Sequence, residues 1–130
     1  MVFPYKGPER RESERLEVHF ILVYEVHKPL EVRMFIGKRE VDALMLDLSE
    51  GGMAILTNYD IPIETFLSIK FTLINPNEID DKRVTLIEIM GQVRYNVLSD
   101  KDEYRLGICF TNIDEQSKKA IAGFIRMSFG

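Results

Sequence analysis

Hydrophobic and polar residues alternate along much of this chain with the period of two that is expected of half-buried β-strands. The alternation is clearest from Leu16 to Val26, and Lys28-Pro29 is expected to end this first strand. Further strands are predicted over residues 30–36, where the pattern is weaker, and over 39–48, 52–57, 66–74, 83–97 and 103–110. The stretches between them, at 37–38, 58–62, 78–82 and 99–102, are predicted to be turns or loops.

The period changes near the end of the chain, where a helix is predicted. Asp114 is a good N-cap for a helix that runs from Glu115 to Met127. One face of this helix carries Ser117, Ala120, Ile121, Phe124, Ile125 and Ser128. That face should dock onto the open side of a sheet or barrel. Gly123, which costs roughly 1 kcal/mol against Ala inside a helix, suggests that the helix is closely packed at that position.

Six or seven strands followed by one helix predict a mainly β fold. We expect a six- to seven-stranded antiparallel β-barrel with the C-terminal helix, about 114–127, packed on it. A chain of 130 residues can bury a real hydrophobic core in one domain, and that domain should span 16–130. Residues 1–15 should form a flexible N-terminal arm, because the segment 9–15 has no apolar face to bury.

The composition of the chain argues against several classes of partner and location. The net charge of −4 argues against DNA or RNA as a partner, and against binding to an anionic membrane by bulk electrostatics. No apolar run approaches the roughly 18 residues that a membrane helix needs, and the N-terminus lacks the hydrophobic core of a signal peptide. Cys109 is the single cysteine, so it cannot form an intramolecular disulfide. These observations predict a cytoplasmic protein without membrane insertion.

Catalytic and metal sites find little support in the sequence. His19 and His27 are both placed on the first predicted strand, about 26 Å apart by strand rise, which is too far to share an ion. Ser49 lacks the Gly-x-Ser-x-Gly elbow of a serine nucleophile. No general base is in evidence. We therefore expect neither an enzyme nor a metal or other cofactor.

Two polar clusters remain as candidates for a functional site. One is the arm segment Glu9-Arg10-Arg11-Glu12-Ser13-Glu14-Arg15, and the other is Asp47-Leu48-Ser49-Glu50-Gly51-Gly52 between two strand-like runs. Taken alone, the first is typical of a solvated charge run, and the second of a tight turn that Asp47 caps through a backbone hydrogen bond. However, Asp47 and Ser49 are two residues apart, so on a strand they would project to the same face. The second cluster is thus also compatible with a binding site.

Together the two clusters resemble the signature of the PilZ domain, a family of bacterial receptors for the second messenger cyclic di-GMP. The matching positions are Arg10, Arg11-x-x-x-Arg15 and, roughly thirty residues later, Asp47-x-Ser49-x-x-Gly52. The later strands and the closing helix also follow the family's order and spacing. The resemblance implies phosphate and base contacts from Arg10, Arg11 and Arg15 on the arm. It places Asp47, Ser49 and Gly52 on the barrel side of the same site.

The chemistry of these residues suits such a ligand, which offers two phosphates and two guanines. Arginine binds phosphate with two donors, reads guanine O6 and N7, and stacks on bases. The carboxylate of Asp47 can accept hydrogens from the Watson–Crick edge of a guanine, and Ser49 can donate or accept. Gly51 and Gly52 would let the backbone approach the ligand closely. We therefore expect a receptor whose arm closes over cyclic di-GMP and which signals to a protein partner.

One feature departs from the family's pattern. The residues between Arg11 and Arg15 are Glu12, Ser13 and Glu14, where family members commonly carry an aromatic or apolar residue in the middle. Two acids beside the arginines lower the local positive potential. Some PilZ domains have lost nucleotide binding and act as protein-interaction adaptors, and such an adaptor is the alternative function for this chain.

Overall fold

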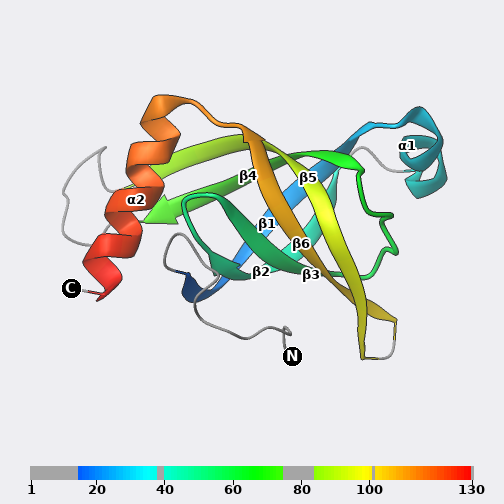
Figure 1. Cartoon of the computed structure of the whole chain (residues 1–130), viewed down its shortest axis with the longest axis horizontal. Coiled ribbons are helices and arrows are strands. Elements are labelled where there is room, and N and C mark those ends of the chain that lie inside the picture. The colour runs from blue at the N-terminus through cyan, green and yellow to red at the C-terminus, as the bar shows by residue number, and fades with distance from the viewer. Residues whose placement is uncertain (1–14, 38–39, 75–83, 101, 130) are drawn as a thin grey trace.

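The structure is a computed structural model that describes residues 15–37, 40–74, 84–100 and 102–129. Six strands and two helices are present in these residues (Figure 1). The strands are β1 (Leu16–Lys28), β2 (Val41–Leu48), β3 (Gly52–Thr57), β4 (Phe66–Ile74), β5 (Val84–Asp100) and β6 (Glu103–Asn112). The helices are α1 (Leu30–Ile36) and α2 (Glu115–Phe129). The arm up to residue 14 and the turn predicted at 78–82 lie outside the described residues, as does Lys38 of the predicted Gly37-Lys38 turn.

The strands form a closed antiparallel barrel in the order β1-β2-β3-β6-β5-β4. The sheet closes because β1 pairs with β2 along one edge and with β4 along the other. The predicted strands at 39–48 and 52–57 pair as the hairpin of β2 and β3, with Leu48 opposite Met53. The mainly β prediction is therefore confirmed, with six strands in the barrel.

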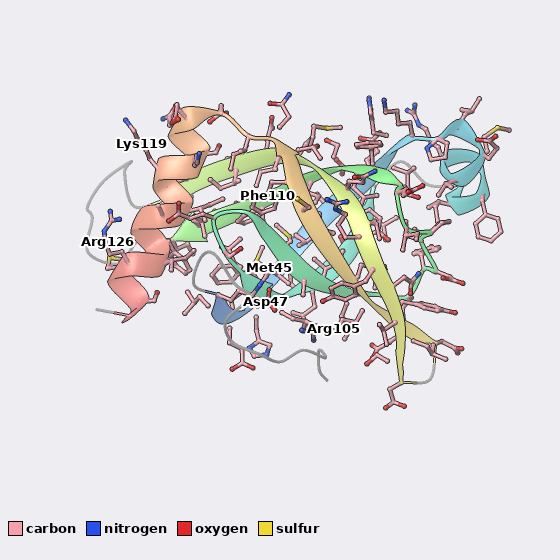
Figure 2. All side chains as sticks on the ribbon, viewed as in Figure 1. Met45, Asp47, Arg105, Phe110, Lys119 and Arg126 are labelled. Carbon is pink, nitrogen blue, oxygen red and sulfur yellow. The ribbon has the colours of Figure 1, made fainter. Side chains whose placement is uncertain are left out.

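The predicted C-terminal helix is also confirmed. The Asp114 Oδ1 atom accepts a hydrogen bond of 2.6 Å from the Ser117 backbone N–H, which caps the first turn of α2. Ser117, Ile121 and Ile125 are buried on its inner face, so the helix covers one end of the barrel (Figure 1). Lys119 and Arg126 lie on the outer side of the helix (Figure 2).

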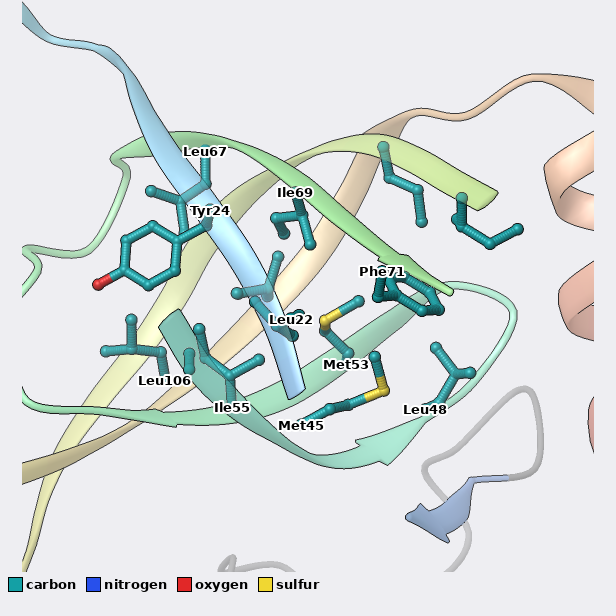
Figure 3. Packing of buried hydrophobic residues seen from close by; sticks show 14 of the residues in the cluster. Leu22, Tyr24, Met45, Leu48, Met53, Ile55, Leu67, Ile69, Phe71 and Leu106 are labelled. Carbon is teal, nitrogen blue, oxygen red and sulfur yellow. The ribbon is translucent and has the colours of Figure 1, made fainter. Parts of the chain in front are cut away.

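The hydrophobic core fills the barrel, because the inward positions of all six strands carry large apolar residues (Figure 3). Among the labelled side chains, Met45, Ile55, Leu67, Ile69 and Leu106 have no exposed surface. Tyr24 carries a polar group inside the barrel. Its hydroxyl is 2.9 Å from the Thr57 Oγ1 atom, so the buried phenol keeps a hydrogen-bond partner.

The prediction of a strand over residues 30–36 is wrong, because these residues form helix α1. Val32 and Ile36 pack toward the barrel, whereas Met34 between them is 71% exposed. A strand would turn all three side chains to one face, so the observed pattern is helical. Pro29 precedes the first turn, a position that needs no backbone N–H donor. Gly37 ends the helix in the left-handed conformation, with φ of 74°.

The close packing suggested at Gly123 is not observed. A Cβ atom at this position would have only the Arg126 Nη2 atom near it, at 4.0 Å. No described helix is both long and apolar enough to cross a membrane.

Replacing Gly123 with Ala should stabilise the protein. The added methyl group meets open space, and Ala is favoured over Gly inside a helix, so the free energy of unfolding should rise by roughly 1 kcal/mol. Urea denaturation would measure this change. Ala122→Gly, one residue earlier on the same helix, is the matched control and should lower the free energy of unfolding. A loss of stability in Gly123→Ala would show that the helix is closely packed there after all.

The stability of the protein should fall in alkaline solution because of Tyr24. Burial raises the pKa of Tyr24 from 10.0 to about 12, although the hydrogen bond with Thr57 opposes this rise. The folded state thus holds this proton more tightly than the unfolded state. The resulting stabilisation, roughly 2–3 kcal/mol, is fully present below pH 10 and is lost as pH rises through about 12.

Denaturant unfolding of wild type and Tyr24→Phe from pH 8 to 12 would test this prediction. The wild type should lose stability more steeply than Tyr24→Phe above pH 10, because only the wild type carries the buried phenol. Parallel curves for the two proteins would contradict the prediction.

Candidate functional site

A bulge on β2 places Asp47 on the outer face of the barrel. Val41, Ala43 and Met45 alternate inward along this strand, so regular alternation would turn Asp47 inward as well. The register with β3 shifts between Met45 and Asp47, which leaves one extra residue on β2. The shift reverses the alternation, and Leu48 rather than Asp47 becomes buried. The Asp47 side chain keeps 18% of its surface exposed.

Ser49 holds the turn that follows β2. Its hydroxyl lies 3.3 Å from the Gly51 N–H and 3.2 Å from the Gly52 N–H, and it donates to the Gly52 carbonyl at 3.2 Å. The Ser49 backbone N–H also donates to the Gly52 carbonyl, at 2.9 Å. Ser49 is only 2% exposed, so its hydroxyl stabilises the turn internally. A direct contact between Ser49 and a ligand stays a prediction.

The two glycines of this turn have different surroundings. A Cβ atom at Gly52 would overlap the Ile108 carbonyl oxygen, because Gly52 pairs with Cys109 where β3 meets β6. The glycine is therefore required by close approach of two backbones. Gly51 is exposed, and a Cβ atom there would meet nothing within 4 Å. An approach of a ligand to Gly51 or Gly52 stays a prediction.

Two arginines converge on Asp47. The Arg15 Nη1 atom donates a hydrogen bond of 2.7 Å to Asp47 Oδ1, across 32 positions of sequence. The Arg105 Nη2 atom lies 3.5 Å from Asp47 Oδ2. Figure 2 shows Arg105 and Asp47 on the same side of the barrel. Each arginine side chain is 32% exposed, so both remain partly accessible to a ligand from solvent.

Arg105 is a site residue that the sequence did not reveal. Strand pairing brings Arg105 close to Asp47. Asp47 on β2 pairs with Ala54 on β3, and Ala54 pairs with Gly107 on β6. Arg105 is two residues before Gly107 on the same strand. Among the described residues, the buried Arg105 Nε atom has no hydrogen-bond partner. Nothing in the local pattern of residues 103–110 marks this arginine as different from any outward polar residue of a strand.

Tyr95 continues the same outer row of the barrel, because it pairs with Gly107 across β5 and β6. A Cβ atom at Gly107 would overlap the Tyr95 ring, so the ring lies directly on the glycine. Tyr95 is half-buried in this position. Its packing thus fixes the edge of the surface that Asp47 and Arg105 share.

The structure brings five of the predicted site residues into one region: Arg15, Asp47, Ser49, Gly51 and Gly52. Arg10 and Arg11 lie outside the described residues, so their contribution stays a prediction. The described residues contain no group of three or more His, Cys, Asp or Glu side chains that could hold a metal ion.

The chemistry of this region suits an anionic ligand rich in hydrogen-bond acceptors. Two guanidinium groups offer several N–H donors beyond those that face Asp47. Each oxygen of the Asp47 carboxylate can accept a further hydrogen bond. Glu17, which pairs with Asp47, and Glu50 are both exposed, so acidic side chains also lie in this part of the surface.

Comparison with known families gives one match that covers most of the chain. The sequence model of the PilZ domain matches residues 9–127. No curated protein is similar enough in sequence to match this chain.

Solved structures with a similar fold are only distantly related in sequence. The Bacillus subtilis inhibitor of motility superposes with a TM-score of 0.70 at 17% identity, over 95% of this chain and 54% of that one. The PilZ domain of YcgR from Escherichia coli, with cyclic di-GMP, superposes with a TM-score of 0.57 at 16% identity, over 92% of this chain and 91% of that one. The Borreliella burgdorferi PlzA protein, in complex with cyclic di-GMP, superposes with a TM-score of 0.57 at 16% identity, over 89% of this chain and 41% of that one. This chain thus spans about half the length of the first of these proteins.

Substitution of the two glycines by Ala should have unequal effects on stability. Gly51→Ala adds a methyl group in open space and should change the free energy of unfolding by less than about 0.5 kcal/mol. Gly52→Ala pushes against the backbone of β6 and should cost roughly 1–3 kcal/mol or more. Thermal or urea unfolding of the two variants would measure the difference. Equal effects would contradict the close approach of β3 and β6 at Gly52.

Proposed function

This chain belongs to the PilZ domain family, and we propose that it is a receptor for cyclic di-GMP. Domains of this family are non-catalytic receptors, so the chain is not an enzyme. The proposed ligand site is the surface around Asp47, together with Arg10 and Arg11 of the arm.

The contact between Arg15 and Asp47 carries this proposal. The two residues belong to the two separate motifs of the family signature, and their side chains meet at 2.7 Å. In this proposal, the last arginine of the arm motif therefore already lies beside the fixed part of the site. A ligand bound there would be within reach of both motifs at once.

In this proposal, phosphate oxygens of the nucleotide compete with Asp47 for the Arg15 guanidinium group. Arginine can serve both partners, because its five N–H donors point in different directions. Arg105 is held against the other carboxylate oxygen and offers a second cation to the ligand. Ser49 keeps the turn in one conformation, which fixes the position of Asp47 before the ligand arrives.

Closure of residues 1–15 over the nucleotide would convert binding into a signal. Arg10 and Arg11 would add charge-assisted hydrogen bonds to phosphate or guanine, so the ligand would determine the path of this segment. The altered surface would then be recognised by a protein partner in a bacterial signalling pathway. The solved structures of YcgR and PlzA with cyclic di-GMP support the proposal at the level of the fold.

A second candidate function is a protein-interaction adaptor that does not bind the nucleotide. The acidic residues Glu12 and Glu14 favour it, since they lie between the arginines of the arm motif and weaken its positive potential. In such an adaptor, the Arg15–Asp47 ion pair would only fasten the start of β1 to β2.

Calorimetric titration with cyclic di-GMP would separate these functions. The wild type should show saturable binding, and Arg15→Ala should weaken it roughly tenfold to a hundredfold, because a hydrogen bond to a charged group contributes about 1.5–3 kcal/mol. Arg126→Ala is the matched control, since this arginine is exposed on α2 away from Asp47. Absence of binding by folded wild type at high micromolar nucleotide would contradict the receptor and favour the adaptor.

A further inference from the structure

Helix α1 displays large apolar side chains that neither the barrel nor the proposed ligand site uses. Leu30, Met34 and Phe35 are 63%, 71% and 78% exposed. Val32 and Ile36 anchor the other side of the helix to the core, so the exposed side is held in a fixed position. A single exposed apolar residue is ordinary, but a contiguous exposed group marks a surface for interaction.

A groove runs beside this helix. It has a volume of about 340 Å³, and it is lined by Lys28, Pro29, Val32, Pro62, Ile63, Glu64, Thr65 and Phe66. Ile63 is itself 56% exposed. The groove is large enough to receive a side chain the size of Phe35. We name this combined surface, α1 with the adjoining groove, the α1 patch.

We propose that the α1 patch binds a second copy of this chain across a twofold axis. In a twofold interface the same surface serves both subunits, so it must complement itself. The α1 patch meets this condition because it holds both a protruding group, Met34 and Phe35, and a groove that can receive it. Phe35 of each subunit enters the groove of the other.

The charges around the α1 patch also fit a second copy. Lys28 and Glu64 line the groove with opposite signs. Arg33 lies 4.0 Å from Glu25, so this pair is internally balanced. Because the surface carries both positive and negative side chains, a twofold rotation can bring the positive charge of one subunit near the negative charge of the other. A strongly acidic or strongly basic partner would not be complementary in charge to such a surface.

The size of the α1 patch approaches that of a dimer interface. Four large apolar side chains, each more than half exposed, make up its apolar part, and the largest apolar patch of a typical monomer, about 300–600 Å², is often functional. The polar rim adds to this area and brings it toward the roughly 800 Å² per partner of a standard interface. Helix α1 and Asp47 lie in different parts of the molecule (Figure 2), so the dimer leaves the ligand site open.

Sedimentation velocity of the full chain, from about 1 to several hundred micromolar, tests the proposal. The wild type should form a dimer as concentration rises. Phe35→Glu should raise the dimer dissociation constant at least roughly a hundredfold, because both subunits lose a buried aromatic ring. Leu86→Glu is the matched control: Leu86 is 60% exposed on β5, outside the α1 patch, and its variant should dimerise as the wild type does.

At a concentration low enough for the wild type to be monomeric, thermal unfolding of both variants should match the wild type, since each changed side chain is exposed. A wild type that is monomeric at every concentration would overturn the proposal and leave the α1 patch to a different protein. A dimer that persists in Phe35→Glu, or that is lost equally in Leu86→Glu, would overturn it as well.

Discussion

The position of one carboxylate, that of Asp47, determines how the candidate site is built. A bulge in β2 turns Asp47 out of the core, and the Ser49 hydroxyl holds the turn that follows. Arg15 reaches the carboxylate from the start of β1, and Arg105 reaches it from β6. Segments distant in the sequence therefore share one anion, which orients two cations toward solvent before any ligand is present.

The register of the barrel wall places small residues beside the charged ones. Gly52 lets β3 approach β6, and Ala54 lies between Asp47 and Gly107 in the register. Pairing across β2, β3 and β6 thus brings the Arg105 guanidinium group to 3.5 Å from the Asp47 carboxylate. Helix α1, by contrast, takes part in neither, and its exposed apolar side remains available to another subunit.

The sequence predicted the barrel well, because alternation along β1 and the capping residue Asp114 are local signals. It failed at residues 30–36, where five apolar residues in seven do not distinguish a short helix from a strand. The spacing of the two motifs predicted that Asp47 and Arg15 belong to one site, and the structure shows that their side chains meet. Arg105 could not be found in this way, because its proximity to Asp47 depends on the register of three strands.

Hydrogen–deuterium exchange with and without cyclic di-GMP tests the central claim most directly, because it reports where the nucleotide acts. The proposed site predicts slower exchange in residues 9–17 and 46–55 when the nucleotide is bound, with no change in α1. Unchanged exchange in both segments at saturating nucleotide, or protection confined to another face of the barrel, would contradict the assignment of Asp47 and its arginines to the ligand.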